Sequence, residues 1–212
     1  MFSGMEADER LFDAQRQAFP NLKVCRWIEP LPGDSLRAYA ARLAPLVDPG
    51  EPCILGGASF GGIIAQELSR HIRAQACIII GSISSPSGIP LKWRMLRPLA
   101  HLPLDRLNSL FYWISKLGRP IIPYNTRRRL LKLSRPEAAF VLWAMCSVLK
   151  WRPPSAPIPT RLFHLHGALD RVFPVHLSKP DLVVPAGGHA LTLFCPTAVN
   201  DYISFVRNEV GG

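Results

Sequence analysis

Short apolar runs separated by amphipathic segments are the feature that most narrows the fold of this 212-residue chain. Residues 76–80 are predicted to form a strand, because 77–80 (Cys-Ile-Ile-Ile) are apolar throughout, as expected for a strand that is buried on both faces of a parallel sheet. Similar runs predict further strands at 22–28, 53–55, 161–166 and 182–184.

The segments between these runs have helical patterns. Asp34 or Ser35 can cap a helix that continues to about Val47, and the glycine-rich start of 61–72 leads into another. Residues 197–209 predict a closing helix. Strands that alternate with helices indicate an α/β protein with a mostly parallel sheet flanked by helices.

Composition excludes several classes of protein. Hydrophobic residues make up 48% of the chain and charged residues 19%, which excludes intrinsic disorder. Residues 1–10 contain no apolar stretch of signal-peptide length. The five cysteines form no C-x-x-C motif, so we expect reduced thiols in a cytoplasmic protein and no metal site.

The positive charge is concentrated in one segment. The net charge is +10, and residues 84–155 hold 13 Lys or Arg against two acidic residues. Proline-rich stretches flank this segment, and Ser-Arg-Pro-Glu at 134–137 is a capping box before a predicted helix at 138–149. We therefore expect a basic helical cap (84–155) inserted into an α/β core made of 1–83 and 156–212.

The densest part of the predicted cap is a cluster of four cations, namely Arg127, Arg128, Arg129 and Lys132. A charge excess of this kind favours an anionic partner. The candidates are an acidic carrier protein and an anionic lipid surface. We do not expect nucleic acid to bind, because no nucleic-acid-binding motif accompanies the charge.

The sharpest motif is Gly57-Ala-Ser59-Phe-Gly61, which lies between a predicted strand and a predicted helix. This is the setting of the G-x-S-x-G nucleophile elbow, in which a tight turn raises the serine at the start of a helix. Small residues at Gly57 and Gly61 let the strand and the helix approach each other. The alternatives are an ordinary glycine-rich turn and a phosphate-binding loop, but the latter lacks its Gly-Lys-Ser/Thr ending.

A serine nucleophile needs a base, and the chain has six histidines. His189 follows two glycines, after the last predicted strand, and is the best candidate. The alternative interpretation of His189 is a histidine in a surface loop without a catalytic role. The others fit less well: His71 ends a helix, His101 lies in the cap and His164 lies within a strand. His166 and His176 lie near the edge of the sheet where the site is expected, but they lack the glycine-rich setting of His189. His164 is expected to be a packed or hydrogen-bonded sheet residue.

The base needs an orienting carboxylate. Asp170 follows a predicted strand in His166-Gly-Ala-Leu-Asp170, at the carboxyl edge where a parallel sheet places its site. The alternative interpretation of Asp170 is an aspartate that only stabilises a turn. Asp181 is a weaker candidate, because it begins a strand and so lies at the opposite edge of the sheet. The resulting order of Ser59, Asp170 and His189 is the order of α/β-hydrolase triads.

With these motifs the chain resembles the α/β-hydrolase-fold superfamily, with a helical cap inserted after the sixth strand. The resemblance implies a Ser-His-Asp triad. Phe2-Ser-Gly-Met5 is similar to the oxyanion loop of that family, which implies an oxyanion hole formed by the N–H groups of Met5 and Phe60. Family members usually carry further strands before this loop. The resemblance therefore implies a fold shortened at the N-terminus, with a sheet edge that favours a homodimer.

The expected function is that of a serine esterase that cleaves carboxylic esters of small or medium acyl chains through an acyl-enzyme, without metal or organic cofactor. One alternative is a thioesterase or acyl-carrier-protein ester hydrolase that docks through the basic cap, because the outline also resembles the pimeloyl-carrier methyl-esterase branch. Another is a non-catalytic binding protein that has kept the fold.

Overall fold

The computed structural model describes residues 1–5, 7–102, 138–152 and 160–211. Its centre is a parallel sheet in which the strands follow their order in the sequence. The strands are β1 (Cys53–Ala58), β2 (Ala74–Ile80), β3 (Arg161–Gly167) and β4 (Leu182–Val184). The α/β fold class and these four predicted strands are confirmed, although β1 continues three residues further than predicted.

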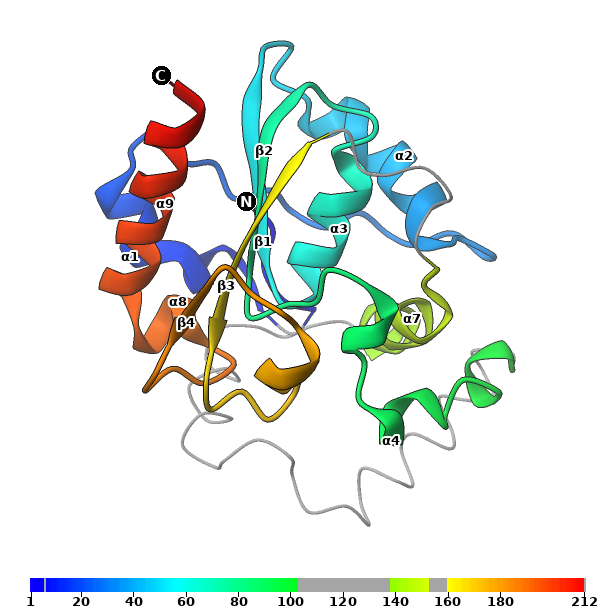
Figure 1. Cartoon of the computed structure of the whole chain (residues 1–212). Coiled ribbons are helices and arrows are strands. Elements are labelled where there is room, and N and C mark those ends of the chain that lie inside the picture. The colour runs from blue at the N-terminus through cyan, green and yellow to red at the C-terminus, as the bar shows by residue number, and fades with distance from the viewer. Residues whose placement is uncertain (6, 103–137, 153–159, 212) are drawn as a thin grey trace.

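Helices cover both faces of the sheet (Figure 1). On one face lie α2 (Leu36–Val47) and α3 (Phe60–Leu68), and on the other lie α1 (Asp13–Ala18) and α9 (Pro196–Gly211). Alternate residues of β2 enter the two cores: Cys77 and Ile79 pack with α3, whereas Ile78 and Ile80 pack with α9. A strand buried on both faces has no polar position, which explains the uninterrupted apolar run.

The three helices predicted in the α/β core are confirmed with small changes at their ends. Ser35 caps α2, because its hydroxyl accepts a hydrogen bond from the Ala38 N–H at 3.2 Å. Helix α3 ends at Leu68, earlier than predicted, and residues 69–72 form a turn. The sequence analysis did not predict α1, the short helix α8 (Leu191–Phe194), or the 3₁₀ turns η1 (Glu9–Phe12) and η4 (Val175–Leu177).

The prediction of a strand at 22–28 is wrong. This segment runs beside Met1, whose carbonyl accepts the Cys25 N–H at 2.9 Å and whose ammonium group donates to the Lys23 carbonyl. The N-terminal residues next to this segment join the sheet through an isolated bridge between Phe2 and Gly57 of β1. A β-ladder needs consecutive paired residues on both sides, and 22–28 does not have them.

The described parts of the predicted cap lie beyond the carboxyl ends of the strands (Figure 1). They comprise η2 (Pro86–Gly88), α4 (Leu91–Arg94), η3 (Leu99–His101) and α7 (Ala138–Lys150). Helix α7 confirms the helix predicted at 138–149. The capping box and the cluster of Arg127, Arg128, Arg129 and Lys132 lie outside the described residues, so the division into core and cap stays a prediction.

Two tryptophans join α7 to the α/β core. Trp143 Nε1–H donates to the Asp34 carbonyl at 3.2 Å, and Trp151 Nε1–H donates to Glu67 Oε1 at 2.8 Å. Glu67 lies on α3, so this bond ties α7 to the helix that follows Ser59. Within the described ranges, no helix has the length and apolar character needed to cross a membrane.

Candidate active site

Ser59 occupies a sharp turn between β1 and α3. Its backbone has φ 53° and ψ −119°, a conformation that residues with a Cβ rarely adopt. Two hydrogen bonds fix the turn: the Ser59 N–H donates to the Ile80 carbonyl at 3.0 Å, and the Ser59 carbonyl accepts the Ser82 hydroxyl at 2.6 Å. The side chain of Ser59 therefore stands at the amino end of α3.

Close backbone contacts require glycine on both sides of Ser59. A Cβ at Gly57 would lie 2.2 Å from the Gly61 carbonyl carbon, and a Cβ at Gly61 would lie 2.1 Å from the Phe2 carbonyl oxygen. Real Cβ atoms essentially never approach other atoms so closely. The structure thus places Gly57 and Gly61 where strand, helix and N-terminal segment touch.

The structure brings Ser59, His189 and Asp170 together. Ser59 Oγ lies 2.9 Å from His189 Nε2, and His189 Nδ1 lies 2.8 Å from Asp170 Oδ2. Both distances are within hydrogen-bond reach. The carboxylate only accepts, so Nδ1 carries the proton and Nε2 is free to accept the Ser59 proton. This is the arrangement of a serine nucleophile, a base and a group that orients the base.

Asp170 is buried and firmly held. Its Oδ1 accepts the N–H groups of Val172 and Phe173 at 2.8 and 2.9 Å, which leaves Oδ2 for His189. Burial opposes ionisation, but the hydrogen bonds from His189 and Phe173 outweigh it and lower the pKa of Asp170 below its ordinary value. Asp170 is therefore a carboxylate at neutral pH and can stabilise a positive charge on His189.

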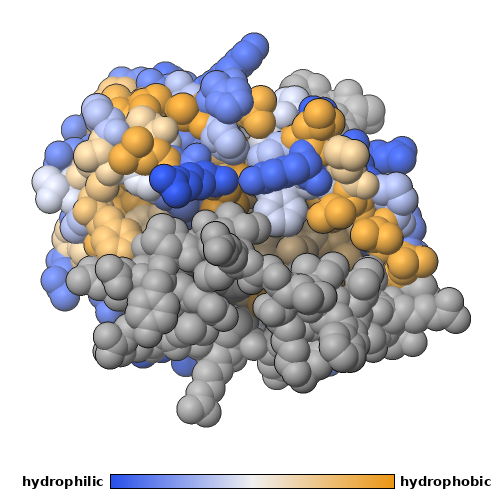
Figure 2. Space-filling view, turned by 90° about the horizontal axis from the view of Figure 1, so that it is seen from below, coloured by the Kyte–Doolittle hydropathy of each residue, from blue (hydrophilic) through white to orange (hydrophobic). Residues whose placement is uncertain are grey.

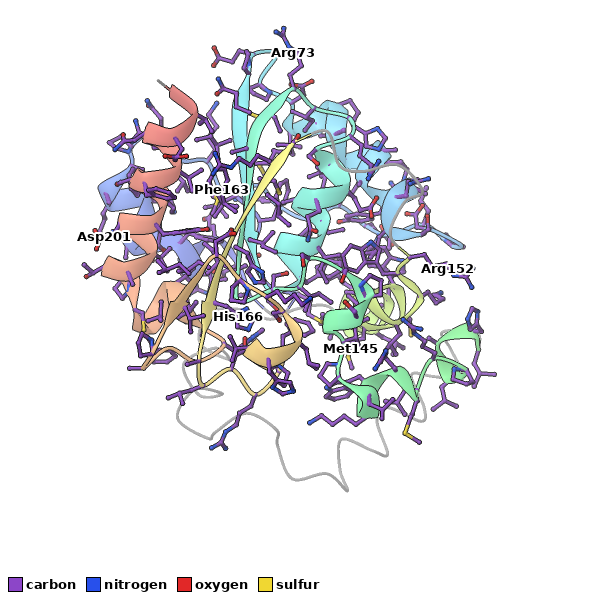
Figure 3. The ribbon with its side chains drawn as sticks, in the orientation of Figure 1. Arg73, Met145, Arg152, Phe163, His166 and Asp201 are labelled. Atoms are coloured by element: carbon purple, nitrogen blue, oxygen red, sulfur yellow. The ribbon has the colours of Figure 1, made fainter. Side chains whose placement is uncertain are left out.

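A histidine pair lies behind Asp170. His166 is completely buried at the carboxyl end of β3 (Figure 3), and His164 is 3% exposed on the same strand. His164 Nε2 lies 3.1 Å from His166 Nδ1. The expectation that His164 is a hydrogen-bonded sheet residue is confirmed. His166 Nε2 lies 3.4 Å from Asp170 Oδ2, and the sequence did not predict this contact.

An apolar cavity of about 280 Å³ opens beside Ser59 and His189. Its walls come from the N-terminal loop, from 89–96, from α7 and from the loop after β3, and they include Met5, Met145 and Phe173. Figure 3 labels Met145 on α7. Figure 2 views the molecule from the side of the sheet's carboxyl edge, where hydrophobic and hydrophilic surfaces lie side by side. The sequence analysis did not find the α7 residues of this wall, because they meet the α/β core only in the fold.

The two groups assigned to the oxyanion hole come from the N-terminal loop and from the start of α3. Met5 lines the cavity, and Phe60 is the first residue of α3. Among the described residues, neither N–H donates to another backbone group. The Phe60 ring is fixed in an aromatic cluster with Trp27, Phe140 and Trp143, at centroid distances of 5.3 to 6.0 Å. That packing holds the amino end of α3 in place.

No part of the described chain brings together three His, Cys, Asp or Glu side chains that could hold a metal ion. Cys77 is buried in the sheet, and burial raises the pKa of its thiol to about 12. Such a thiol is protonated at neutral pH and is not a nucleophile. Of the described residues that line the cavity, Ser59, His189 and Thr192 have polar side chains.

Residues 18–202 match a family described as the alpha/beta hydrolase family, and the chain belongs to that family. It is similar to an esterase from Thermogutta terrifontis, with 19% identity and a TM-score of 0.71 over 99% of this chain and 88% of the other. It is similar to MenH from S. aureus, with 15% identity and a TM-score of 0.71 over 100% and 93%.

A third similar structure is BorB, a type II thioesterase from the borrelidin biosynthetic cluster. Its identity is 16% and its TM-score 0.61, over 96% of this chain and 89% of the other. No curated protein matches the chain. At these identities the structures establish the fold, and the chemistry is argued from the residues of this chain.

Proposed function

We propose that the protein is a serine hydrolase that cleaves carboxylic esters of small or medium apolar acyl groups. The observation that carries the proposal is the continuous contact from Ser59 Oγ through His189 to Asp170, at 2.9 and 2.8 Å, at the wall of an apolar cavity. Membership of the alpha/beta hydrolase family supports hydrolysis as the class of reaction.

The reaction has two halves. In the first, Ser59 Oγ attacks the ester carbonyl while His189 Nε2 takes its proton, and the negative charge on the carbonyl oxygen is stabilised by the N–H groups of Met5 and Phe60. His189 then gives the proton to the departing alcohol, which leaves an acyl group on Ser59. In the second half, His189 deprotonates a water molecule that attacks the acyl carbon; the bond to Ser59 Oγ breaks, the carboxylic acid leaves, and His189 returns the proton to Ser59 Oγ.

The walls of the cavity support an apolar acyl group. Besides Ser59 and His189, only Thr192 among the described lining residues has a polar side chain, and the other described side chains are apolar or aromatic. A charged acyl chain would lose its hydration against these apolar walls, which is strongly unfavourable. A volume of about 280 Å³ is near the lower end of ligand pockets and fits a short or medium chain.

A thioester could be cleaved by the same residues, because the attack on the carbonyl does not depend on the leaving atom. Docking of an acidic carrier protein or an anionic lipid surface on Arg127, Arg128, Arg129 and Lys132 stays a prediction, since these residues lie outside the described part of the chain. The homodimer and the cytoplasmic location also stay predictions.

Hydrolysis of p-nitrophenyl esters from acetate to laurate tests the proposal. We expect turnover that peaks at a short or medium acyl chain and falls by at least about 10⁴-fold in Ser59→Ala. Ser87→Ala is the matched control, because Ser87 is an exposed serine outside the cavity lining. No turnover by the folded wild type would favour a binding protein that has kept the fold, and equal turnover by Ser59→Ala would contradict a mechanism through Ser59.

A further inference from the structure

The histidine pair behind Asp170 forms a continuous chain of hydrogen bonds. On a strand, side chains two residues apart point to the same face, so His164 and His166 stack on one side of β3. Their ring centroids are 5.1 Å apart, and the rings are nearly perpendicular at 82°. His166 Nε2 lies 2.7 Å from the Phe173 carbonyl oxygen and 3.4 Å from Asp170 Oδ2.

The acceptor at the end of this chain determines where the protons lie. A carbonyl oxygen only accepts, so His166 Nε2 carries a proton and donates to Phe173. Burial, the largest influence, lowers the pKa of His166, so the ring is neutral and its Nδ1 accepts. His164 must then donate from Nε2. Its own pKa is lowered to about 4 by burial and by the neighbouring His166, so it too is neutral.

Phe173 connects the pair to the active site in three ways. Its N–H donates to Asp170 Oδ1, its carbonyl accepts from His166, and its ring lies 5.7 Å from the His189 ring at an angle of 60°. Phe173 also lines the cavity. Phe173 thus holds Asp170, contacts His189 and forms part of the cavity wall.

We propose that His166, oriented by His164, is a positioning residue that fixes Phe173 and Asp170 so that the acid holds His189 in line with Ser59. This inference rests on the proposed function and deepens it. Neither histidine of the pair lines the cavity, so both act on the reaction through Asp170 and Phe173 and not through substrate. Among the described residues, the titratable groups around the pair are Asp170, His189, Asp181 and Tyr202.

If His166 acts through its hydrogen bond, His166→Gln should be more active than His166→Phe. If His166 only filled space, His166→Phe should be the more active variant. His166→Phe keeps a ring but has no donor for the Phe173 carbonyl, whereas His166→Gln keeps an N–H donor and loses the ring. We expect kcat to fall by roughly 10–100-fold in His166→Phe with KM changed by less than about threefold, because a small misplacement of catalytic groups has effects of this size. His166→Gln should retain most of the activity.

His176→Gln and His176→Phe are the matched controls. His176 is an exposed histidine in η4, on the loop that follows Asp170 and Phe173. Both controls should have the wild-type kcat. Activity of His166→Phe equal to or higher than that of His166→Gln would overturn the inference, because a side chain that only fills space is better replaced by a ring.

Nitrogen-15 chemical shifts of the imidazole rings in the wild type test the same chain without a variant that has to fold. We expect both His164 and His166 to be neutral and protonated on Nε2 at neutral pH. A proton on Nδ1 of either ring would overturn the inference.

Labelling by a fluorophosphonate separates this inference from the proposed function. If the wild type does not react, the proposed function fails, and the positioning role fails with it. If the wild type reacts and His166→Phe reacts equally fast, the positioning role alone is wrong. The inference expects a fast wild type, a slow His166→Phe and an intermediate or fast His166→Gln.

Discussion

The backbone of Ser59 leads to a prediction about stability. With φ 53° and ψ −119°, Ser59 is in a region that only glycine adopts easily, and a strained residue of this kind costs about 1–3 kcal/mol. Ser59→Ala and Ser59→Gly both remove the hydroxyl and its 2.9 Å contact with His189, so comparing them isolates the backbone. Glycine relieves the strain, and its additional freedom in the unfolded chain offsets roughly 0.5–1 kcal/mol of the gain.

Ser59→Gly should therefore be more stable than Ser59→Ala by about 0.5–2 kcal/mol. For a chain of this length that difference corresponds to a rise in Tm of roughly 1–8 °C. Urea unfolding followed by circular dichroism gives the free energies of unfolding, and differential scanning calorimetry gives Tm. Ser87 provides the control pair, because its φ is not positive and glycine should be the less stable replacement there. A Ser59→Gly variant no more stable than Ser59→Ala would refute the assignment of strain to this turn.

Three further predictions concern the packing around the site. Gly61→Ala should lower the free energy of unfolding by about 3 kcal/mol or more, because its Cβ would lie 2.1 Å from the Phe2 carbonyl oxygen, and a wild-type urea midpoint would contradict this. His164 stays neutral in the native state down to about pH 4, whereas the unfolded chain binds a proton at this residue below about pH 6.5. The neutral His164 therefore contributes roughly 3 kcal/mol to the free energy of unfolding above pH 6.5, and this contribution is lost as the pH falls toward 4. Urea titrations across this range should show a shallower loss for His164→Phe than for the wild type, and parallel curves would argue against a neutral His164. Trp151→Phe should cost about 1–3 kcal/mol, because it leaves the buried Glu67 carboxylate without its 2.8 Å donor, and a double-mutant cycle with Glu67→Gln should recover part of that loss.

The features that could be predicted from the sequence are local. The elbow needs only Gly57, Ser59 and Gly61 between a strand and a helix, because the contacts that require glycine join neighbouring elements. The buried strand β2 is visible because both of its faces are covered, so that every position from Cys77 to Ile80 is apolar. The carboxyl-edge rule then places Asp170 near Ser59 without any knowledge of long-range contacts.

The features that could not be predicted depend on distant partners. The segment 22–28 has the composition of a strand, but its pairing depends on the short backbone run beside Met1. The spacing of His164 and His166 shows that they share a face, yet their role depends on the Phe173 carbonyl at 2.7 Å, which a loop brings back to the strand. The cavity wall formed by α7 depends on contacts such as the bond from Trp143 to the Asp34 carbonyl, 109 residues apart in sequence.

The central claim is that Ser59 is a nucleophile activated by His189. The most direct measurement is the site of the adduct formed with a fluorophosphonate, located by mass spectrometry of peptides from the intact wild-type protein. The account predicts one adduct, on Ser59, that is absent from Ser59→Ala and forms at least about 10³-fold more slowly in His189→Gln. A folded wild type without an adduct, or one modified at another residue, would contradict the account.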